Sequence, residues 1–144
     1  MMKVGVIGGG QLGRMLALAG TPLGMEFSFL DPADDACAAP VGKHLHAAYD
    51  AQAELQQLAQ SMDVVTFEFE NVPAEAVAYL AQHVPVFPNA ESLRVARDRL
   101  NEKSMFRELD IPVTAFANVE SQQLLDEALA TMGLPAILKT RTLG

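Results

Sequence analysis

A run of three glycines near the amino terminus constrains the fold more than any other feature of the sequence. Residues 3–7 form a short apolar run with β-branched side chains, and residues 8–10 are all glycine. Residues 11–19 then place apolar side chains at helical spacing. An apolar run, a glycine turn and an amphipathic segment predict a strand, a tight turn and a helix in that order.

Strand and helix signals continue to alternate up to Pro88. The apolar run at residues 25–30 predicts a second strand, which ends at Asp31. Beyond it we predict strands at residues 44–47, 64–67 and 84–87, and helices at residues 51–61 and 73–81. Short loops join these segments, so the pattern predicts an α/β fold with a Rossmann-like parallel sheet and right-handed crossovers.

The last third of the chain carries a second, shorter series of signals. We predict one charged helix at residues 92–109, a strand at 113–117, a helix at 121–132 capped by Ser121, and a strand at 135–139. A helix and two strands after a complete sheet are typical of the start of another domain. We therefore predict one domain at residues 1–97 and the beginning of a second, truncated domain at residues 98–144.

Composition narrows the classes of partner. The formal net charge of −8 predicts a surface that repels a phosphate backbone, so we expect no nucleic-acid partner. No run of 18 apolar residues occurs, and residues 1–7 are too short for a signal sequence, so we expect no membrane partner. Cys37 is the only cysteine, which excludes an intrachain disulfide and a thiolate metal site and suits a cytoplasmic protein.

The glycine turn is the first candidate binding site. Gly8, Gly10 and Gly13 have the spacing at which glycines allow a tight turn and close approach of the backbone to a phosphate. A structural turn without a ligand is the alternative interpretation. Asp31 ends the second strand, where a dehydrogenase places the carboxylate that binds a ribose, but an Asp-Pro pair is equally an ordinary turn.

Two carboxylates follow the strand at residues 64–67. Glu68 and Glu70 flank Phe69 at the carboxyl end of this strand, the edge where open α/β sheets bind ligands. Residues two apart on an extended chain point to the same side, so both could hold an amine or a ribose hydroxyl, or act in acid and base chemistry. The alternative is a solvated strand end beside a helix start.

Other polar residues carry weaker signals. His44 and His46 alternate on a predicted strand but lack a third ligand at suitable spacing, so we expect no metal there. Arginines and lysines at residues 94–107 alternate with carboxylates and predict a solvated helix face. Lys139 ends the last predicted strand, close to Arg141 and a following glycine, and could neutralise nucleotide phosphates.

Four ordered segments carry a resemblance to a known family. They are Val-Ile-Gly-Gly-Gly-Gln-Leu-Gly-Arg-Met at residues 6–15, Thr-Phe-Glu-Phe-Glu-Asn-Val at 66–72, Asp-Arg-Leu-Asn-Glu-Lys at 98–103, and Leu-Lys-Thr-Arg-Thr-Leu-Gly at 138–144. Together they resemble the 5-(carboxyamino)imidazole ribonucleotide synthetases, ligases of purine biosynthesis in the ATP-grasp superfamily. The resemblance implies a pre-ATP-grasp domain followed by the start of an ATP-grasp domain.

The resemblance also implies a reaction. ATP phosphorylates bicarbonate to carboxyphosphate, and the amine of aminoimidazole ribonucleotide captures the released carbon dioxide. The products are 5-(carboxyamino)imidazole ribonucleotide, ADP and phosphate. Magnesium would bridge the ATP phosphates. The magnesium ligands of the family fall outside this chain, so we expect the fragment alone to be inactive and the full-length enzyme to be a homodimer.

Site residues follow from the same resemblance. The ATP contacts of the family fall on Arg99, on Lys139 and on the loop that begins at Gly144. The ribonucleotide contacts fall on the glycine turn and the two residues after it, that is on Gly8, Gly10, Gln11, Leu12 and Gly13. By similarity to the related glycinamide ribonucleotide ligase, Glu68 would also touch the ribonucleotide. No catalytic side chain and no metal ligand is assigned.

Two alternatives stay open beside this ligase. An NAD-dependent oxidoreductase would use the glycine turn and Asp31, but it explains neither residues 98–103 nor Lys139. In the resembling family the amino-terminal domain does not use NAD. A non-catalytic nucleotide-binding module is the third class.

Overall fold

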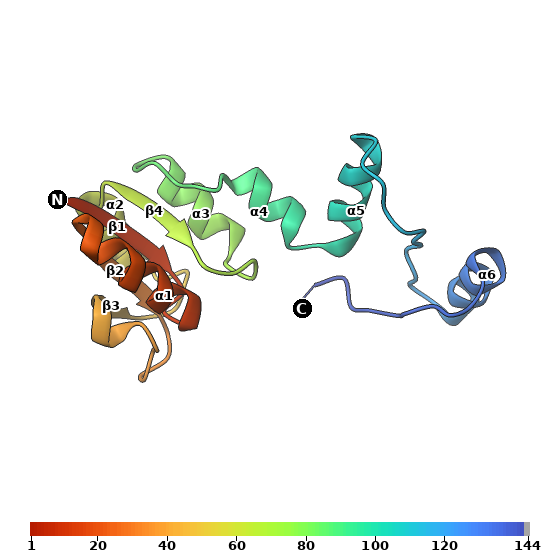
Figure 1. Ribbon diagram of the computed structural model, residues 1–144, viewed down its shortest axis with the longest axis horizontal. Coiled ribbons are helices and arrows are strands. Elements are labelled where there is room, and N and C mark those ends of the chain that lie inside the picture. Colours follow the sequence, from red (N-terminus) through yellow and green to blue (C-terminus); the bar gives the residue numbers. More distant parts are fainter. Residues whose placement is uncertain (143–144) are drawn as a thin grey trace. The chain divides into compact units, whose positions relative to one another are not determined.

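The computed structural model describes residues 1–142 and divides into two compact units. The first unit is Met1–Arg94 and the second begins at Val95. The strand, turn and helix predicted at the amino terminus are present: the strand is β1 at Met2–Ile7, and the helix is α1 at Gln11–Gly20. Figure 1 shows the elements in chain order.

The first unit is built on a four-stranded parallel sheet. Its other strands are β2 at Met25–Asp31, β3 at Lys43–His46 and β4 at Val64–Phe67, and the strand order is β3-β2-β1-β4. Every strand pair is parallel. The α/β fold predicted from the sequence is therefore confirmed.

The register of the sheet brings three loops to one edge. Ile7 of β1 lies level with Leu30 of β2 and with Phe67 of β4. Since all strands run in the same direction, the residues that follow them meet at the carboxyl edge. This edge therefore collects the glycine turn, Asp31 and Glu68.

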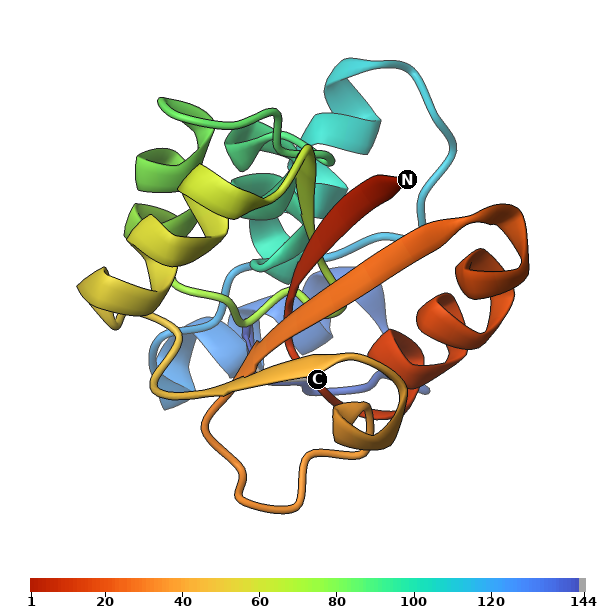
Figure 2. The same ribbon diagram turned by 90° about the vertical axis from the view of Figure 1, so that its left-hand side faces the viewer.

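Helices cover both faces of the sheet. Helix α1 lies on one side, whereas α2 at Gln52–Ser61 and α3 at Ala74–Ala81 lie on the other (Figure 2). Short 3-10 turns, η1 at Thr21–Leu23 and η2 at Ala39–Val41, lead into β2 and β3. One buried cluster includes Ile7, Leu30, Leu55, Leu58, Val77 and Leu80, and the other, beneath α1, includes Val4, Val6, Ala17, Phe27 and Phe29.

Small residues let α1 approach the sheet closely. The buried residues of this helix are Gly13, Ala17 and Gly20. A Cβ atom at Gly20 would come within 2.5 Å of the Phe27 ring. The close approach holds the amino terminus of α1 against the carboxyl edge, beside the ends of β1 and β4.

The predicted strand at residues 84–87 is reduced to one parallel bridge between Val65 and Val86. The Val65 N–H donates to Pro85 O at 2.9 Å, and the Phe87 N–H donates to Val65 O at 3.0 Å. Proline has no N–H to extend a ladder, and prolines stand at 85 and 88. The segment is therefore an edge contact and not a full strand.

In the last third of the chain, the prediction of a single helix at residues 92–109 is wrong. The structure has two helices instead, α4 at Ala90–Ala96 and α5 at Arg99–Glu108. Asp98 separates them, because its carboxylate accepts hydrogen bonds from the N–H groups of Leu100 at 2.8 Å and Asn101 at 3.4 Å. An aspartate cap of this kind starts a new helix.

The predicted helix at residues 121–132 is confirmed as α6 at Gln122–Met132, and the Ser121 hydroxyl accepts from the Leu124 N–H at 3.2 Å. The strands predicted at 113–117 and 135–139 are absent from the described part of the chain. A strand needs a partner for its ladder, and neither segment has one here. Ile137 accordingly leaves 82% of its surface exposed. Within residues 1–142, no helix has the length and apolar character needed to cross a membrane.

Candidate functional site

The glycine turn begins at a residue that only glycine suits. Gly8 has φ +106°, and its N–H donates to Leu30 O at 2.9 Å, which ties the turn to β2. Gly10 is the N-cap of α1, with no side chain of its own to accept from the helix. The amino terminus of α1 therefore needs an acceptor from elsewhere in the chain.

Glu68 supplies that acceptor. Its Oε1 accepts from the Gly10 N–H at 2.8 Å, and its Oε2 accepts from the Gly13 N–H. The carboxylate thus bonds to the N-cap and to the third helical residue and places a negative charge on the positive end of the helix dipole. Glu68 directly follows β4, so the parallel sheet delivers it to α1.

The glycine spacing is explained by this contact. A Cβ atom at Gly8 would overlap Glu68 Cγ. One at Gly10 would lie 2.7 Å from Oε1, and one at Gly13 would lie 2.9 Å from Oε2. All three glycines of the motif make room for the Glu68 carboxylate, without any phosphate.

Only part of the turn remains open to a ligand. The N–H groups of Gly10 and Gly13 are taken by Glu68, and that of Gly9 is taken by Asp31. Across residues 1–142, the N–H groups of Gln11 and Leu12 have no hydrogen-bond acceptor, and both residues are exposed. These are the two positions that the family resemblance assigns most specifically to the ribonucleotide.

Asp31 is a structural carboxylate. It is 7% exposed and accepts from the Gly9 N–H at 2.7 Å, the Ala33 N–H at 2.8 Å and the Tyr49 hydroxyl at 3.0 Å. Burial alone would raise the pKa of Asp31, but these hydrogen bonds outweigh it and hold the pKa below its usual value. Both oxygens are engaged within the chain, which supports the turn interpretation over a dehydrogenase ribose site.

Tyr49 lies between Asp31 and the segment after β4. Its ring packs against Phe69 with centroids 5.4 Å apart. Burial, followed by the hydrogen bond to Asp31, raises the pKa of Tyr49 well above its usual value. No sequence pattern marks this residue, because it stands in a loop without a motif. Glu70, the predicted companion of Glu68, is half-buried and makes no hydrogen bond to the glycine turn.

The two histidines of β3 bind the loop after β2. His44 Nε2 lies 3.1 Å from Asp31 O, and His46 Nε2 lies 2.9 Å from Pro32 O and 3.2 Å from an Asp34 carboxylate oxygen. Among residues 1–142, no group of three or more His, Cys, Asp or Glu side chains converges as a metal site would require. The histidines thus hold Asp31, the last residue of β2, and the start of the loop that follows it.

The second unit contains the residues predicted for ATP. The Arg99 N–H donates to Arg141 O at 2.9 Å, and Lys139 is exposed. Gly144 lies outside the described residues. Arg141 also forms an ion pair with Asp98 that no sequence pattern marks, with Arg141 Nε 3.1 Å from Asp98 Oδ2. This contact lowers the pKa of Asp98. It joins the start of α5 to the segment that carries Lys139.

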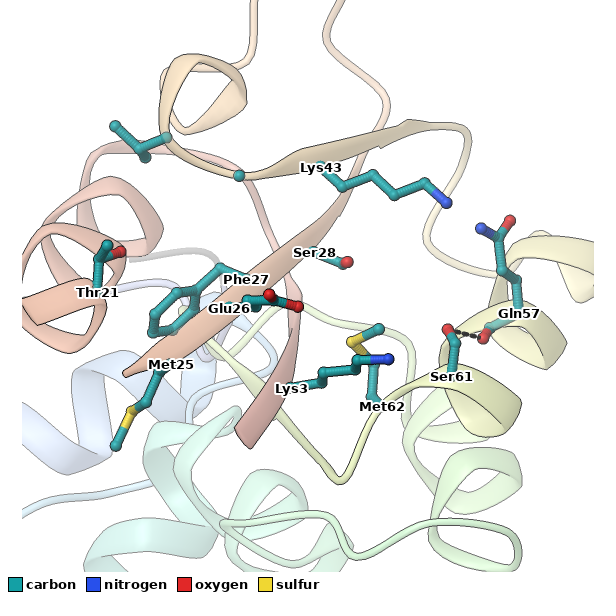
Figure 3. A pocket seen from close by; sticks show the side chains of 12 residues that line it. Lys3, Thr21, Met25, Glu26, Phe27, Ser28, Lys43, Gln57, Ser61 and Met62 are labelled. Carbon is teal, nitrogen blue, oxygen red and sulfur yellow. Dashed lines mark hydrogen bonds between the residues drawn. The ribbon is translucent and has the colours of Figure 1, made fainter. Parts of the chain in front are cut away.

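A cleft of the first unit lies at the opposite edge of the sheet. Its volume is about 500 Å³, and it lies at the amino ends of β1, β2 and β3. Figure 3 shows Lys3, Glu26 and Lys43 among the side chains that line it. Open parallel sheets bind their ligands at the carboxyl edge, where backbone N–H groups and loop side chains converge. We therefore place the candidate site at the glycine turn.

Comparisons with known proteins identify the family of the chain. A family model described as the ribonucleotide synthetase preATP-grasp domain matches residues 1–97. The chain therefore belongs to the ribonucleotide synthetase preATP-grasp family, and the resemblance found in its motifs is confirmed.

Individual relatives are more specific. The chain is 70% identical, over 143 residues, to the N5-carboxyaminoimidazole ribonucleotide synthase of Pseudomonas aeruginosa; the match covers 99% of this chain and 40% of that protein. The N5-carboxyaminoimidazole ribonucleotide synthetase structure from Thermus thermophilus matches with a TM-score of 0.89 at 48% identity, over 96% of this chain and 38% of that one.

A third relative carries ligands. It is the N5-carboxyaminoimidazole synthase of Aspergillus clavatus in complex with ADP and 5-aminoimidazole ribonucleotide, with a TM-score of 0.82 at 32% identity, over 93% of this chain and 37% of that one. The chain thus spans about two fifths of the length of such relatives.

A matched pair of glycine variants tests whether Gly8 makes room for the Glu68 side chain. Gly8 and Gly24 both have positive φ, but a Cβ at Gly24 meets nothing within 4 Å. Gly24→Ala should lower the free energy of unfolding by about 1–2 kcal/mol, the cost of a left-handed backbone. Gly8→Ala should lower it by about 1–3 kcal/mol more, because it also breaks the Glu68 hydrogen bonds. Urea unfolding measures both.

Adding Glu68→Ala completes a double-mutant cycle. In that background the effect of Gly8→Ala should shrink toward that of Gly24→Ala. An undiminished effect would show that Glu68 is not what the glycine accommodates.

The depressed pKa of Asp31 predicts a pH dependence. A carboxyl whose pKa is lower in the folded than in the unfolded chain stabilises the fold above the unfolded pKa, about 3.9, and loses that effect as the pH falls through the folded value. The stability difference between wild type and Asp31→Asn should therefore be largest above about pH 4 and shrink below it. Urea unfolding between pH 3 and pH 7 measures it, with exposed Asp35→Asn as control for the loss of a charge. A difference that does not change with pH contradicts the assignment.

Proposed function

We propose that this chain is the ribonucleotide-binding amino-terminal part of a ligase that carboxylates aminoimidazole ribonucleotide. The reaction uses ATP and bicarbonate and gives 5-(carboxyamino)imidazole ribonucleotide, ADP and phosphate. One observation carries the proposal: Glu68 is held at the amino terminus of α1 beside the open N–H groups of Gln11 and Leu12, in a chain 70% identical to a synthase of this kind.

The carboxyl edge offers two kinds of contact to the ribonucleotide. The Glu68 carboxylate accepts from an amine or a ribose hydroxyl, since its remaining lone pairs are free to do so. The N–H groups of Gln11 and Leu12 donate to an oxygen of the ligand. Gly8, Gly10 and Gly13 hold both groups in place by fixing the path of the turn.

The ATP side belongs to the second unit. Lys139 and Arg99 are the cations of the proposed ATP contacts, and the loop that begins at Gly144 completes them. Magnesium would offset the phosphate charge as the γ-phosphoryl group moves to bicarbonate. Among residues 1–142, no group of three or more His, Cys, Asp or Glu side chains converges, so we assign the magnesium no ligand in this chain and propose that the chain serves to orient substrates.

The chemistry of the whole enzyme then follows. Bicarbonate oxygen attacks the γ-phosphorus of ATP and ADP leaves, which forms carboxyphosphate. Carboxyphosphate breaks down to carbon dioxide and phosphate, and the ribonucleotide amine adds to the carbon and loses a proton. We further propose that the complete enzyme is a cytoplasmic homodimer. We also propose that it has no nucleic-acid partner, because the net charge of −8 on this chain would repel a phosphate backbone.

An oxidoreductase is the weaker alternative. Asp31, the residue that would hold an adenosine ribose, accepts three hydrogen bonds from its own chain. Glu68 also places a negative charge where a dinucleotide pyrophosphate would bind. A non-catalytic nucleotide-binding module is distinguished only by an activity assay.

The test uses the complete encoded protein, the product of the reading frame that contains this chain. ADP release with ATP, magnesium and bicarbonate should rise at least tenfold when aminoimidazole ribonucleotide is added. Lys139→Ala should lower kcat/KM for ATP by at least about tenfold, as expected for loss of a charged phosphate contact. Lys43→Ala is the control, because Lys43 is an exposed lysine at the far edge of the sheet. ADP release at the same rate with and without aminoimidazole ribonucleotide would contradict the proposal.

A further inference from the structure

The middle glycine of the turn is held from both sides. The Gly9 N–H donates to Asp31 Oδ2 at 2.7 Å, and the Gly9 carbonyl accepts from the Ala38 N–H at 2.7 Å. A Cβ at Gly9 would lie 3.0 Å from Asp31 Cβ and 3.2 Å from Ala36 Cβ. The segment after β2 therefore fixes the peptide that precedes the open N–H groups of α1.

Tyr49 joins this contact to the other half of the site. Its hydroxyl donates to Asp31 Oδ2, the same oxygen that accepts from Gly9. Its ring lies against Phe69, which is adjacent to Glu68 in the chain. The pKa of Tyr49 is raised mainly by burial and then by the contact with Asp31. The negative charge of Glu68 raises it further, as expected for groups close in space.

We propose that Asp31 and Tyr49 are positioning residues for the ribonucleotide, and this inference rests on the proposed function. Asp31 holds the glycine turn, Phe69 holds the segment that carries Glu68, and Tyr49 connects the two. The connection keeps the Glu68 carboxylate and the N–H groups of Gln11 and Leu12 at one fixed spacing. Neither Asp31 nor Tyr49 touches the ligand.

The physical argument is preorganisation. A ligand that bonds to both groups binds tightly only if they are already spaced for it, because each group that must be ordered on binding reduces the affinity. The partly buried hydrogen bond from the Tyr49 hydroxyl to Asp31 opposes such disorder. Its removal should loosen the spacing without removing any group that contacts the ribonucleotide.

Tyr49→Phe in the complete encoded protein is the test, because it removes the hydroxyl and keeps the ring on Phe69. KM for aminoimidazole ribonucleotide should rise about three- to tenfold, the range expected for one hydrogen bond. KM for ATP and kcat should change by less than about twofold. Tyr79→Phe is the matched control, since Tyr79 is the other tyrosine, lies on α3, and packs its ring against His83 just after that helix. An unchanged KM for the ribonucleotide in Tyr49→Phe would overturn the inference.

A second readout separates this inference from the proposed function. Hydrogen exchange at the Gly9, Gly10 and Gly13 amides should speed up about three- to tenfold in Tyr49→Phe and stay unchanged in Tyr79→Phe. If the wild-type protein shows no ribonucleotide-dependent activity but exchange responds, the positioning contact stands and the proposed ligand is wrong. If exchange does not respond, the positioning role is wrong whatever the activity.

Discussion

The bond between Glu68 and the amino terminus of α1 is the interaction on which the candidate site depends. It satisfies two N–H groups that a helix start leaves unpaired, and it brings a charge from the end of β4 to the glycine turn that follows the neighbouring strand β1. Without it, the same turn would offer an anion site of the dinucleotide-binding kind. With it, the turn presents a carboxylate and two remaining donors.

This occupancy changes what the glycine motif means. In a dehydrogenase the spacing makes room for a pyrophosphate, whereas here it makes room for a side chain of the same protein. Asp31 shows the same change of role, because it holds Gly9 in place of a ribose. The glycine motif and Asp31, two features that suggest a dinucleotide site in the sequence, thus have structural roles in the fold.

Sequence alone predicted most of the first unit and less of the second. Strong signals at residues 3–19, 25–30 and 64–67 give the strands and helix that form the parallel sheet, because apolar periodicity is local information. The prediction of one helix at residues 92–109 failed because helical periodicity concealed the Asp98 cap. The predictions of strands at residues 113–117 and 135–139 failed because strand formation needs a pairing partner. The contact of Glu68 with Gly10 joins residues 58 positions apart, a distance that no local pattern reports.

The most direct test of this account is the position of the amide proton resonances of Gly10 and Gly13 in the complete encoded protein. Hydrogen bonds to a carboxylate move such resonances downfield. The account predicts that Glu68→Ala shifts both upfield, whereas Glu70→Ala leaves them in place because Glu70 makes no bond to the turn. Resonances that do not move in Glu68→Ala would contradict the claim that Glu68 occupies the amino terminus of α1.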